Sequence, residues 1–203
     1  MPGVSYAALT PNMTGFDRAM AAGVDEIAVF ASASEGFSQA NLNCSISESI
    51  DRFRTVLEAA KVRSVPVRGY VSCVTDCPFD GPTPPEQTAK VAGILRGLGC
   101  YEVSLGDTIG RGTPETVDAM LAAVLEAVPA GALAGHYHDT GGRALDNIDV
   151  SLARGLRVFD ASVGGLGGCP YAPGAAGNVA TEAVHARLTA LGYDAGLDAA
   201  VLE

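Results

Sequence analysis

The chain has 203 residues, of which 48% are hydrophobic and 18% are charged, and this balance excludes an intrinsically disordered chain. Its 13 basic and 23 acidic side chains give a net charge of −10, which argues against a nucleic-acid partner. No run approaches the ~18 consecutive apolar residues of a membrane span, and no secretory or transit signal is visible. The length predicts a single domain over residues 1–203, and five scattered cysteines favour reduced thiols and a cytoplasmic location.

Short, apolar, β-prone runs alternate along the chain with longer helical patterns. Because most of these runs are continuously apolar, they are typical of strands buried on both faces of a parallel sheet. Their mean spacing is about 31 residues, the length of one β-α-β step. The predicted strands begin near Val4, Glu26, Val67, Tyr101, Ala132 and Arg157.

Capping signals predict the helices between these strands. A capping box at Ser45 opens a helix that runs to about Lys61. A second box at Thr83, with Pro84 at the first helical position, opens another. Further helices are predicted over about 114–128, after residue 146, and over about 180–191.

Two architectures fit this alternation: an open doubly wound sheet and a (β/α)8 barrel. The first β-α turn lacks the Gly-x-Gly-x-x-Gly pattern of a dinucleotide-binding sheet. Polar and glycine-rich residues follow five of the strands, and a barrel places its chemistry at those strand ends. We therefore predict an α/β fold of the (β/α)8 TIM-barrel type, incomplete, with about six βα units and the first two missing.

Two histidines stand at the end of the fifth predicted strand. Alternate residues of a strand point to the same face, so His136 and His138 should project together into the barrel mouth. A metal site and a pair of hydrogen-bonded histidines in a polar rim explain this spacing equally well. Asp139 follows directly, and the amide oxygen of Asn178 would suit a hard cation such as Mg²⁺ or Mn²⁺. Two imidazoles and one amide are neutral, so a tight divalent site would need at least one carboxylate more.

A glycine-rich loop after the last predicted strand carries Cys169, followed by Pro170. A thiol in such a loop could act as an acid or a nucleophile if its surroundings tune its pKa. The alternative is a small buried hydrophobic residue.

Two charged residues, Arg68 and Glu102, fall inside predicted strands. Charged residues inside a barrel strand are rarely without a role. The simplest interpretation of the two is a buried ion pair.

Several segments resemble one enzyme family. They are RGYVSC (68–73), SLGDTIG (104–110), HYHDT (136–140) and GGLGGCPYA (164–172), with NLNCS (41–45) and GAAGN (174–178). Together they resemble the 3-hydroxy-3-methylglutaryl-CoA (HMG-CoA) lyases over essentially the whole chain. The histidine and Gly-Asp-Thr motifs alone are similar to a wider superfamily of metal-dependent barrels, which includes isopropylmalate and homocitrate synthases and 4-hydroxy-2-oxovalerate aldolases. The Gly-Gly-Cys-Pro-Tyr-Ala loop narrows the resemblance to the lyases.

The resemblance implies a divalent cation, Mg²⁺ or Mn²⁺, held by His136, His138 and Asn178. It implies cleavage of HMG-CoA, a CoA thioester, to acetoacetate and acetyl-CoA, the chemistry of leucine degradation. It does not identify the basic residues that would bind the CoA anion. We also expect a homo-oligomer, a dimer.

The same resemblance implies catalytic roles for Cys169, His136 and Asp107, with Glu182 as a supporting polar group. Cys169 would close over the site and act as the acid that protonates the acetyl-CoA enolate.

One departure from the family concerns its first strand, which ends in an Arg-Asp-Gly motif that supplies a metal-binding carboxylate. No Arg-Asp-Gly occurs in this sequence, and the matching segments begin at the third strand of the family. We therefore expect an N-terminally truncated lyase with weakened metal affinity and exposed sheet edges. The alternatives are a related condensing synthase or aldolase, and a non-catalytic remnant that folds only as an oligomer.

Overall fold

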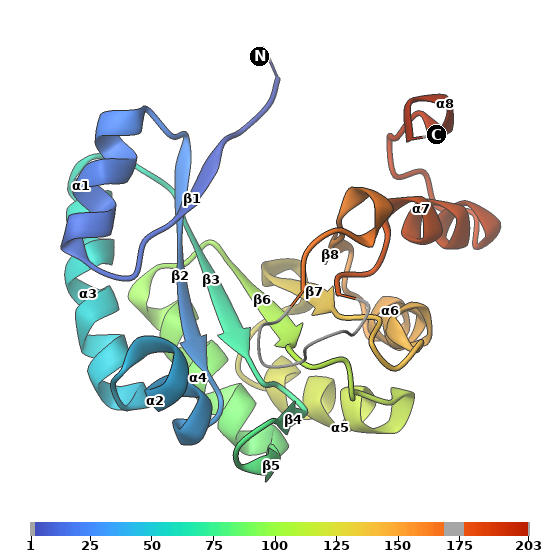
Figure 1. Ribbon diagram of the computed structural model, residues 1–203, viewed down its shortest axis with the longest axis horizontal. Coiled ribbons are helices and arrows are strands. Elements are labelled where there is room, and N and C mark those ends of the chain that lie inside the picture. Colours follow the sequence, from blue (N-terminus) through green and yellow to red (C-terminus); the bar gives the residue numbers. More distant parts are fainter. Residues whose placement is uncertain (1–2, 169–176, 203) are drawn as a thin grey trace.

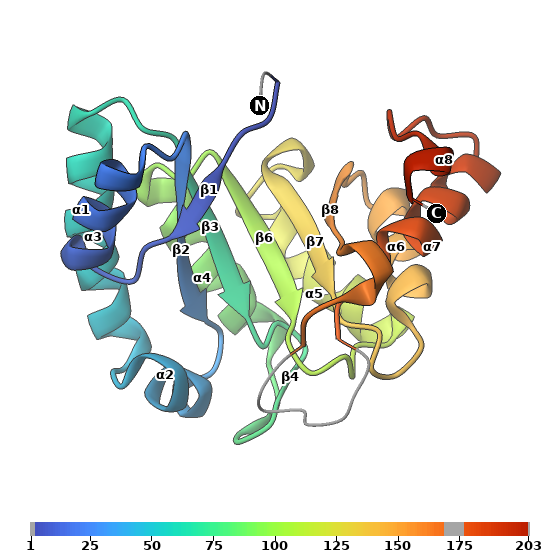
Figure 2. The ribbon, with the colours of Figure 1, turned by 45° about the horizontal axis from the view of Figure 1, so that its top comes forward.

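The computed structural model describes residues 3–168 and 177–202. Its main sheet, as far as these residues go, has six parallel strands in the order β1-β2-β3-β6-β7-β8 (Figures 1 and 2). Each strand lies beside the next one along the chain, whereas a doubly wound sheet reverses its strand order at a switch point. This order confirms the predicted incomplete TIM-barrel type. The strands are β1 (Ala7–Leu9), β2 (Glu26–Ser32), β3 (Val67–Ser72), β6 (Glu102–Asp107), β7 (Leu133–Tyr137) and β8 (Val158–Asp160).

The sheet is curved, and helices line its outer, convex side (Figure 2). A two-stranded hairpin, β4 (Asp76–Cys77) and β5 (Gly81–Pro82), follows β3. None of the helices in the described part of the chain is long and apolar enough to cross a membrane. The helices are α1 (Met13–Ala22), α2 (Glu35–Leu42), α3 (Ile46–Val62), α4 (Pro85–Leu98), α5 (Pro114–Leu125), α6 (Ala144–Ala153), α7 (Thr181–Ala190) and α8 (Ala199–Leu202), with 3-10 turns η1 (Ala130–Ala132) and η2 (Val163–Gly165).

Alternate residues of each strand serve different faces of the sheet. In β6, Val103 and Leu105 are fully buried among the helices of the convex side. Their neighbours Glu102 and Ser104 point to the concave side, where they meet polar groups of adjacent strands. The hydrophobic core therefore lies between the sheet and its helices, and the concave face is available for chemistry.

One of the two predicted capping boxes is present in the structure. Ser45 and Glu48 form the expected capping box at the start of α3. The box predicted at Thr83 is wrong, because the helix begins at Pro85 and Pro84 is its N-cap, without a side-chain cap hydrogen bond. A proline disfavours helical backbone in the residue before it, so Pro85 holds Pro84 extended.

The ends of several elements differ from the prediction. The first strand begins at Ala7 instead of near Val4, and α6 begins at Ala144, before Asp146. Helix α5 ends at Leu125, after which the chain continues in turns through Val128. The sequence patterns did not identify α1, α2 or the hairpin.

Candidate active site

The two histidines lie together at the carboxyl end of β7, on the concave side of the sheet. Their ring centroids are 5.4 Å apart, close enough for both rings to contact one ion at about 2.1 Å from nitrogen to metal. His138 is 8% exposed, and its Nδ1 atom is buried without a hydrogen-bond partner. An unsatisfied buried nitrogen of this kind is what a ligand would complete.

Burial and the neighbouring His136 lower the pKa of His138, although hydrogen bonding to the Thr108 backbone and the Asn178 side chain opposes this. This lowered pKa favours the neutral form of the His138 ring. A metal-binding imidazole must be in this neutral form.

Asn178 is brought to the histidines by backbone pairing. It forms an isolated antiparallel bridge with His138, flanked by a 2.8 Å hydrogen bond from the Asp139 N–H to the Gly177 carbonyl. Its side-chain Nδ2 donates to the Leu166 carbonyl at 3.0 Å, so the amide oxygen is the atom left to interact with His138. The structure thus brings together the three residues that the sequence analysis named as metal ligands.

The donor set is neutral, as expected. In the described part of the chain, no three His, Cys, Asp or Glu side chains gather closely enough to hold a metal ion. Two imidazoles and an amide oxygen fit a divalent cation that also takes oxygen ligands from substrate or water. Without a carboxylate the affinity of this set should be weak.

A cavity of about 660 Å³ opens over the concave face beside the histidines. Tyr70 stands edge-on to His136, with ring centroids 6.2 Å apart. Gly168, the last described residue before Cys169, also reaches this cavity. The lining combines apolar strand residues with polar groups and comprises Ala7, Ala8, Leu9, Ala28, Phe30, Asn41, Tyr70, Val71, Ser72, Gly106, Thr108, His136, His138 and Gly168.

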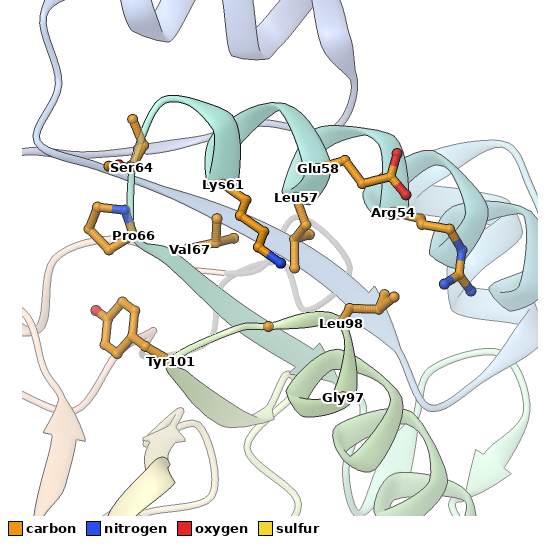
Figure 3. A pocket seen from close by; sticks show the side chains of 12 residues that line it. Arg54, Leu57, Glu58, Lys61, Ser64, Pro66, Val67, Gly97, Leu98 and Tyr101 are labelled. Carbon is orange, nitrogen blue, oxygen red and sulfur yellow. The ribbon is translucent and has the colours of Figure 1, made fainter.

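Figure 3 shows a second cavity, of about 730 Å³, at the opposite end of the strands. It lies between the last turns of α3 and α4, where Leu57 and Lys61 of α3 face Leu98 and Tyr101. Barrels of this type carry their chemistry at the carboxyl ends of the strands. This second cavity is therefore a groove between helices, and the histidine cavity is the candidate active site.

Asp107 ends β6 and is 1% exposed. One carboxylate oxygen accepts from the Gly112 N–H at 2.8 Å, and the other accepts from the Arg111 N–H at 3.2 Å and the Thr75 hydroxyl at 3.4 Å. Both oxygens thus hold the turn that leads to α5. A catalytic role for Asp107 stays a prediction, and its contacts favour an indirect role through this turn.

Glu182 lies in the first turn of α7, and both of its carboxylate oxygens accept from the Gly164 N–H, at 2.9 and 3.0 Å. It therefore anchors the start of the glycine-rich loop. Asp139 accepts from the Ala144 N–H at 3.0 Å and so holds the start of α6. Cys169 lies outside the described residues, so its role as an acid stays a prediction.

The sequence analysis missed Asp160, the last residue of β8. Its Oδ2 lies 3.2 Å from Nδ1 of His136 and accepts from the Ser104 hydroxyl at 2.8 Å, while its Oδ1 accepts from Arg68 at 2.8 Å. Burial would raise the pKa of Asp160, but the His136 contact, the Arg68 charge and the Ser104 hydroxyl lower it below the ordinary value. An acidic residue that interrupts the apolar run Val158-Phe159 was the available signal.

The buried ion pair predicted for Arg68 and Glu102 is present, at 2.7 Å. Arg68 also donates to the Tyr70 hydroxyl and lies over the Tyr70 ring. Arg68 therefore links two carboxylates and an aromatic side chain on the concave face.

The open parallel sheet, with helices on its convex side and paired histidines at the carboxyl ends of its strands, defines a partial barrel of the TIM type. Residues 4–203 match the family described as HMGL-like, and the chain belongs to this family. Within it, the chain is similar to the HMG-CoA lyases. It is 57% identical over 196 residues to the hydroxymethylglutaryl-CoA lyase of Pseudomonas mevalonii, covering 97% of this chain and 65% of that one.

Two solved structures of HMG-CoA lyases are also similar to this chain. The HMG-CoA lyase of Brucella melitensis is 64% identical with a TM-score of 0.97, over 98% of this chain and 71% of that one. An HMG-CoA lyase of Acinetobacter baumannii, solved with coenzyme A and 3-methylmalate, is 31% identical with a TM-score of 0.93, over 100% of this chain and 66% of that one. The chain spans about two thirds of the length of these relatives.

Proposed function

We propose that this chain carries the site that cleaves HMG-CoA to acetoacetate and acetyl-CoA with the help of a divalent cation. The observation that carries the proposal is the convergence of His136, His138 and Asn178 beside a cavity of about 660 Å³ at the carboxyl ends of the strands. Membership of the HMGL-like family and the similarity to named HMG-CoA lyases support it.

His136, His138 and Asn178 would hold the cation, Mg²⁺ or Mn²⁺. When bound, the cation would polarise the oxygens of the substrate and lower the pKa of its tertiary hydroxyl. The chain itself keeps both imidazoles available, because burial holds His138 neutral and Asp160 binds the Nδ1 side of His136.

The remaining cavity residues would receive the substrate. Tyr70, Ser72 and Thr108 line the cavity with polar groups, and Ala28 and Phe30 would help to exclude water from the reacting carbon–carbon bond. We assign to Cys169 the protonation of the acetyl-CoA enolate. Asp107 and Glu182 would act through the turn and the loop that they hold.

A CoA thioester is the substrate class that we propose, and the Acinetobacter relative, solved with coenzyme A, supports it. A homodimer and a cytoplasmic location are further parts of the proposal. Size-exclusion chromatography with light scattering tests the first, and cell fractionation tests the second.

The decisive experiment measures acetoacetate release from HMG-CoA by the purified chain, with Mg²⁺ or Mn²⁺ and then with excess chelator. We expect release that the chelator abolishes and that His138→Gln reduces by at least about 100-fold, since a ligand is lost. His185→Gln is the matched control, because His185 lies on α7, where it lines a separate cavity with Arg157 and Tyr193 and is not among the residues lining the histidine cavity.

The other outcomes are equally informative. A chain that is folded by circular dichroism but releases no acetoacetate with either cation would contradict the proposed function and favour the non-catalytic alternative. Turnover that yields a condensation product or an aldehyde would identify a synthase or an aldolase instead.

A further inference from the structure

Asp160 and His136 face each other across neighbouring parallel strands. The register of β7 and β8 pairs the two residues directly, and this places both side chains on the concave face. Asp160 Oδ2 lies 3.2 Å from His136 Nδ1. An ionised carboxylate can only accept hydrogen bonds, so this contact requires a proton on Nδ1 of His136. In the neutral ring, that proton leaves Nε2 with its lone pair.

The carboxylate of Asp160 is itself held on both oxygens. The Arg68 guanidinium donates to Oδ1 at 2.8 Å, and the Ser104 hydroxyl donates to Oδ2 at 2.8 Å. Arg68 is held in turn by Glu102 at 2.7 Å on the far side. The carboxylate therefore cannot rotate away from His136 without breaking an ion pair and a hydrogen bond.

We propose that Asp160 is a positioning residue that fixes the ring of His136 with its proton on Nδ1 and Nε2 presented to the ligand. This inference rests on the proposed function for the identity of that ligand, a divalent cation. Carboxylates that orient a metal-binding histidine in this way raise metal affinity by about 10–100-fold.

The variant Asp160→Asn gives a sharp test because an amide has one oxygen. Arg68 is a cation without an acceptor, so it selects that oxygen and turns the amide NH₂ toward His136 and Ser104. The NH₂ then donates to Nδ1, and the ring proton moves to Nε2. The variant should therefore switch the tautomer of His136 while it preserves the size of the side chain.

Glu102→Gln is the matched control. Glu102 and Asp160 bind the same guanidinium at 2.7 and 2.8 Å, and both side chains are largely buried, at 12% and 20% exposure. Glu102 shows no contact with His136 among the described interactions. A purely structural role of the carboxylates on Arg68 would affect both variants alike.

Two measurements on the intact chain decide the matter. Nitrogen-15 NMR of labelled histidine, with the His136 signal assigned by its loss in His136→Gln, reports the tautomer in the absence of metal. Mn²⁺ alone, titrated and followed by electron paramagnetic resonance, reports affinity. We expect an Nδ1 proton in the parent chain, an Nε2 proton in Asp160→Asn with at least 10-fold weaker Mn²⁺ binding, and parent values in Glu102→Gln.

The tautomer of His136 in the parent chain tests the role of Asp160 even if a variant does not fold or Mn²⁺ binds too weakly to measure. A proton on Nε2 in the parent chain would overturn it, as would an equal loss of Mn²⁺ affinity in the two variants. Failure of HMG-CoA cleavage with an intact Nδ1 proton and Mn²⁺ binding would overturn the proposed function and leave the role of Asp160 standing.

Discussion

The two faces of the central sheet are built from the same strands, but one presents buried apolar side chains and the other presents charged ones. On the convex face, Val103 and Leu105 of β6 are fully buried under the helices. On the concave face, Arg68, Glu102 and Asp160 form a chain of ion pairs with side chains that are 12–20% exposed. Stability on the first face depends on packing, whereas order on the second depends on matched charges and hydrogen bonds.

This difference shows why a barrel strand can change its chemistry without losing its fold. One residue of shift along a strand moves a side chain from the core to the site. If the two faces are independent, a substitution on one face should leave the other unchanged.

The largest effect is expected on the concave face, where Arg68→Met removes the only cation shared by Glu102 and Asp160 among the described contacts. Leaving buried carboxylates without their cation costs about 3–5 kcal/mol of the free energy of unfolding. Urea denaturation measures this change. The double variant Arg68→Met/Glu102→Gln should recover part of the loss, because one of the unpaired charges is gone. A double variant no more stable than the single one would show that lost packing of the Arg68 stem, and not unpaired charge, sets the cost.

A comparable loss should follow from Leu105→Ala on the convex face, for a different reason. The substitution leaves a cavity in a fully buried cluster, which costs about 2–5 kcal/mol. Val62→Ala is the control, since Val62 is 88% exposed and its substitution should stay within about 0.5 kcal/mol. If the faces are independent, the folded Leu105→Ala chain keeps the parent's Mn²⁺ affinity. A weaker affinity would show that core packing also sets the geometry of the histidines.

The predictability of the chain from its sequence follows the same division. Strand β2 begins at the predicted residue, Glu26, and β3 begins at the predicted Val67. Both were predictable because strands buried on both faces of a parallel sheet have continuous apolar sequences. Helix α3 was predictable from its capping box at Ser45. The helix after Thr83 was displaced by a local backbone effect of Pro85, which the capping pattern does not register.

Spacing alone predicted the candidate site only where its residues lie close together in the chain, whereas Asn178 and the Arg68–Glu102 pair were inferred from side-chain chemistry. His136 and His138 share a face because they are two apart on one strand. The partnership of Asp160 with His136 depends on the register between β7 and β8 and on Arg68 from a third strand. Such contacts form only when the strands pair in the sheet, so residue spacing along the sequence does not predict them.

A smaller effect is expected in how stability depends on pH, where the buried carboxylate of Asp107 and the exposed one of Asp80 should act with opposite sign. Burial raises the pKa of Asp107, although hydrogen bonds from Gly112, Arg111 and Thr75 oppose this. On acidification the folded chain then binds this proton before the unfolded chain does, so Asp107 adds stability as the pH falls toward its ordinary pKa of 3.8. The hydrogen bonds from Ser34 and Gly36 lower the pKa of Asp80. The contribution of Asp80 is therefore present above the ordinary pKa and is lost as the pH falls through the lowered one.

Urea midpoints between pH 7 and pH 3.5 check these signs. Relative to the parent, Asp107→Asn should lose stability more steeply on acidification, and Asp80→Asn should lose it less steeply. Two shifts of the same sign would mean that the turn held by Asp107 stabilises its ionised form after all.

The smallest effect is expected from an ion pair on the outer surface whose geometry is as good as that of Arg68. Arg154 donates to both carboxylate oxygens of Asp118, at 2.6 and 2.7 Å, and so joins α5 to α6. These side chains are 37% and 48% exposed, and solvent and salt screen their attraction. Asp118→Asn should therefore leave the urea midpoint unchanged within error at 0.15 M salt. If Asp118→Asn instead destabilised the chain as much as Arg68→Met does, geometry would outweigh burial in setting the strength of these pairs, and the contrast between the two regions would fail.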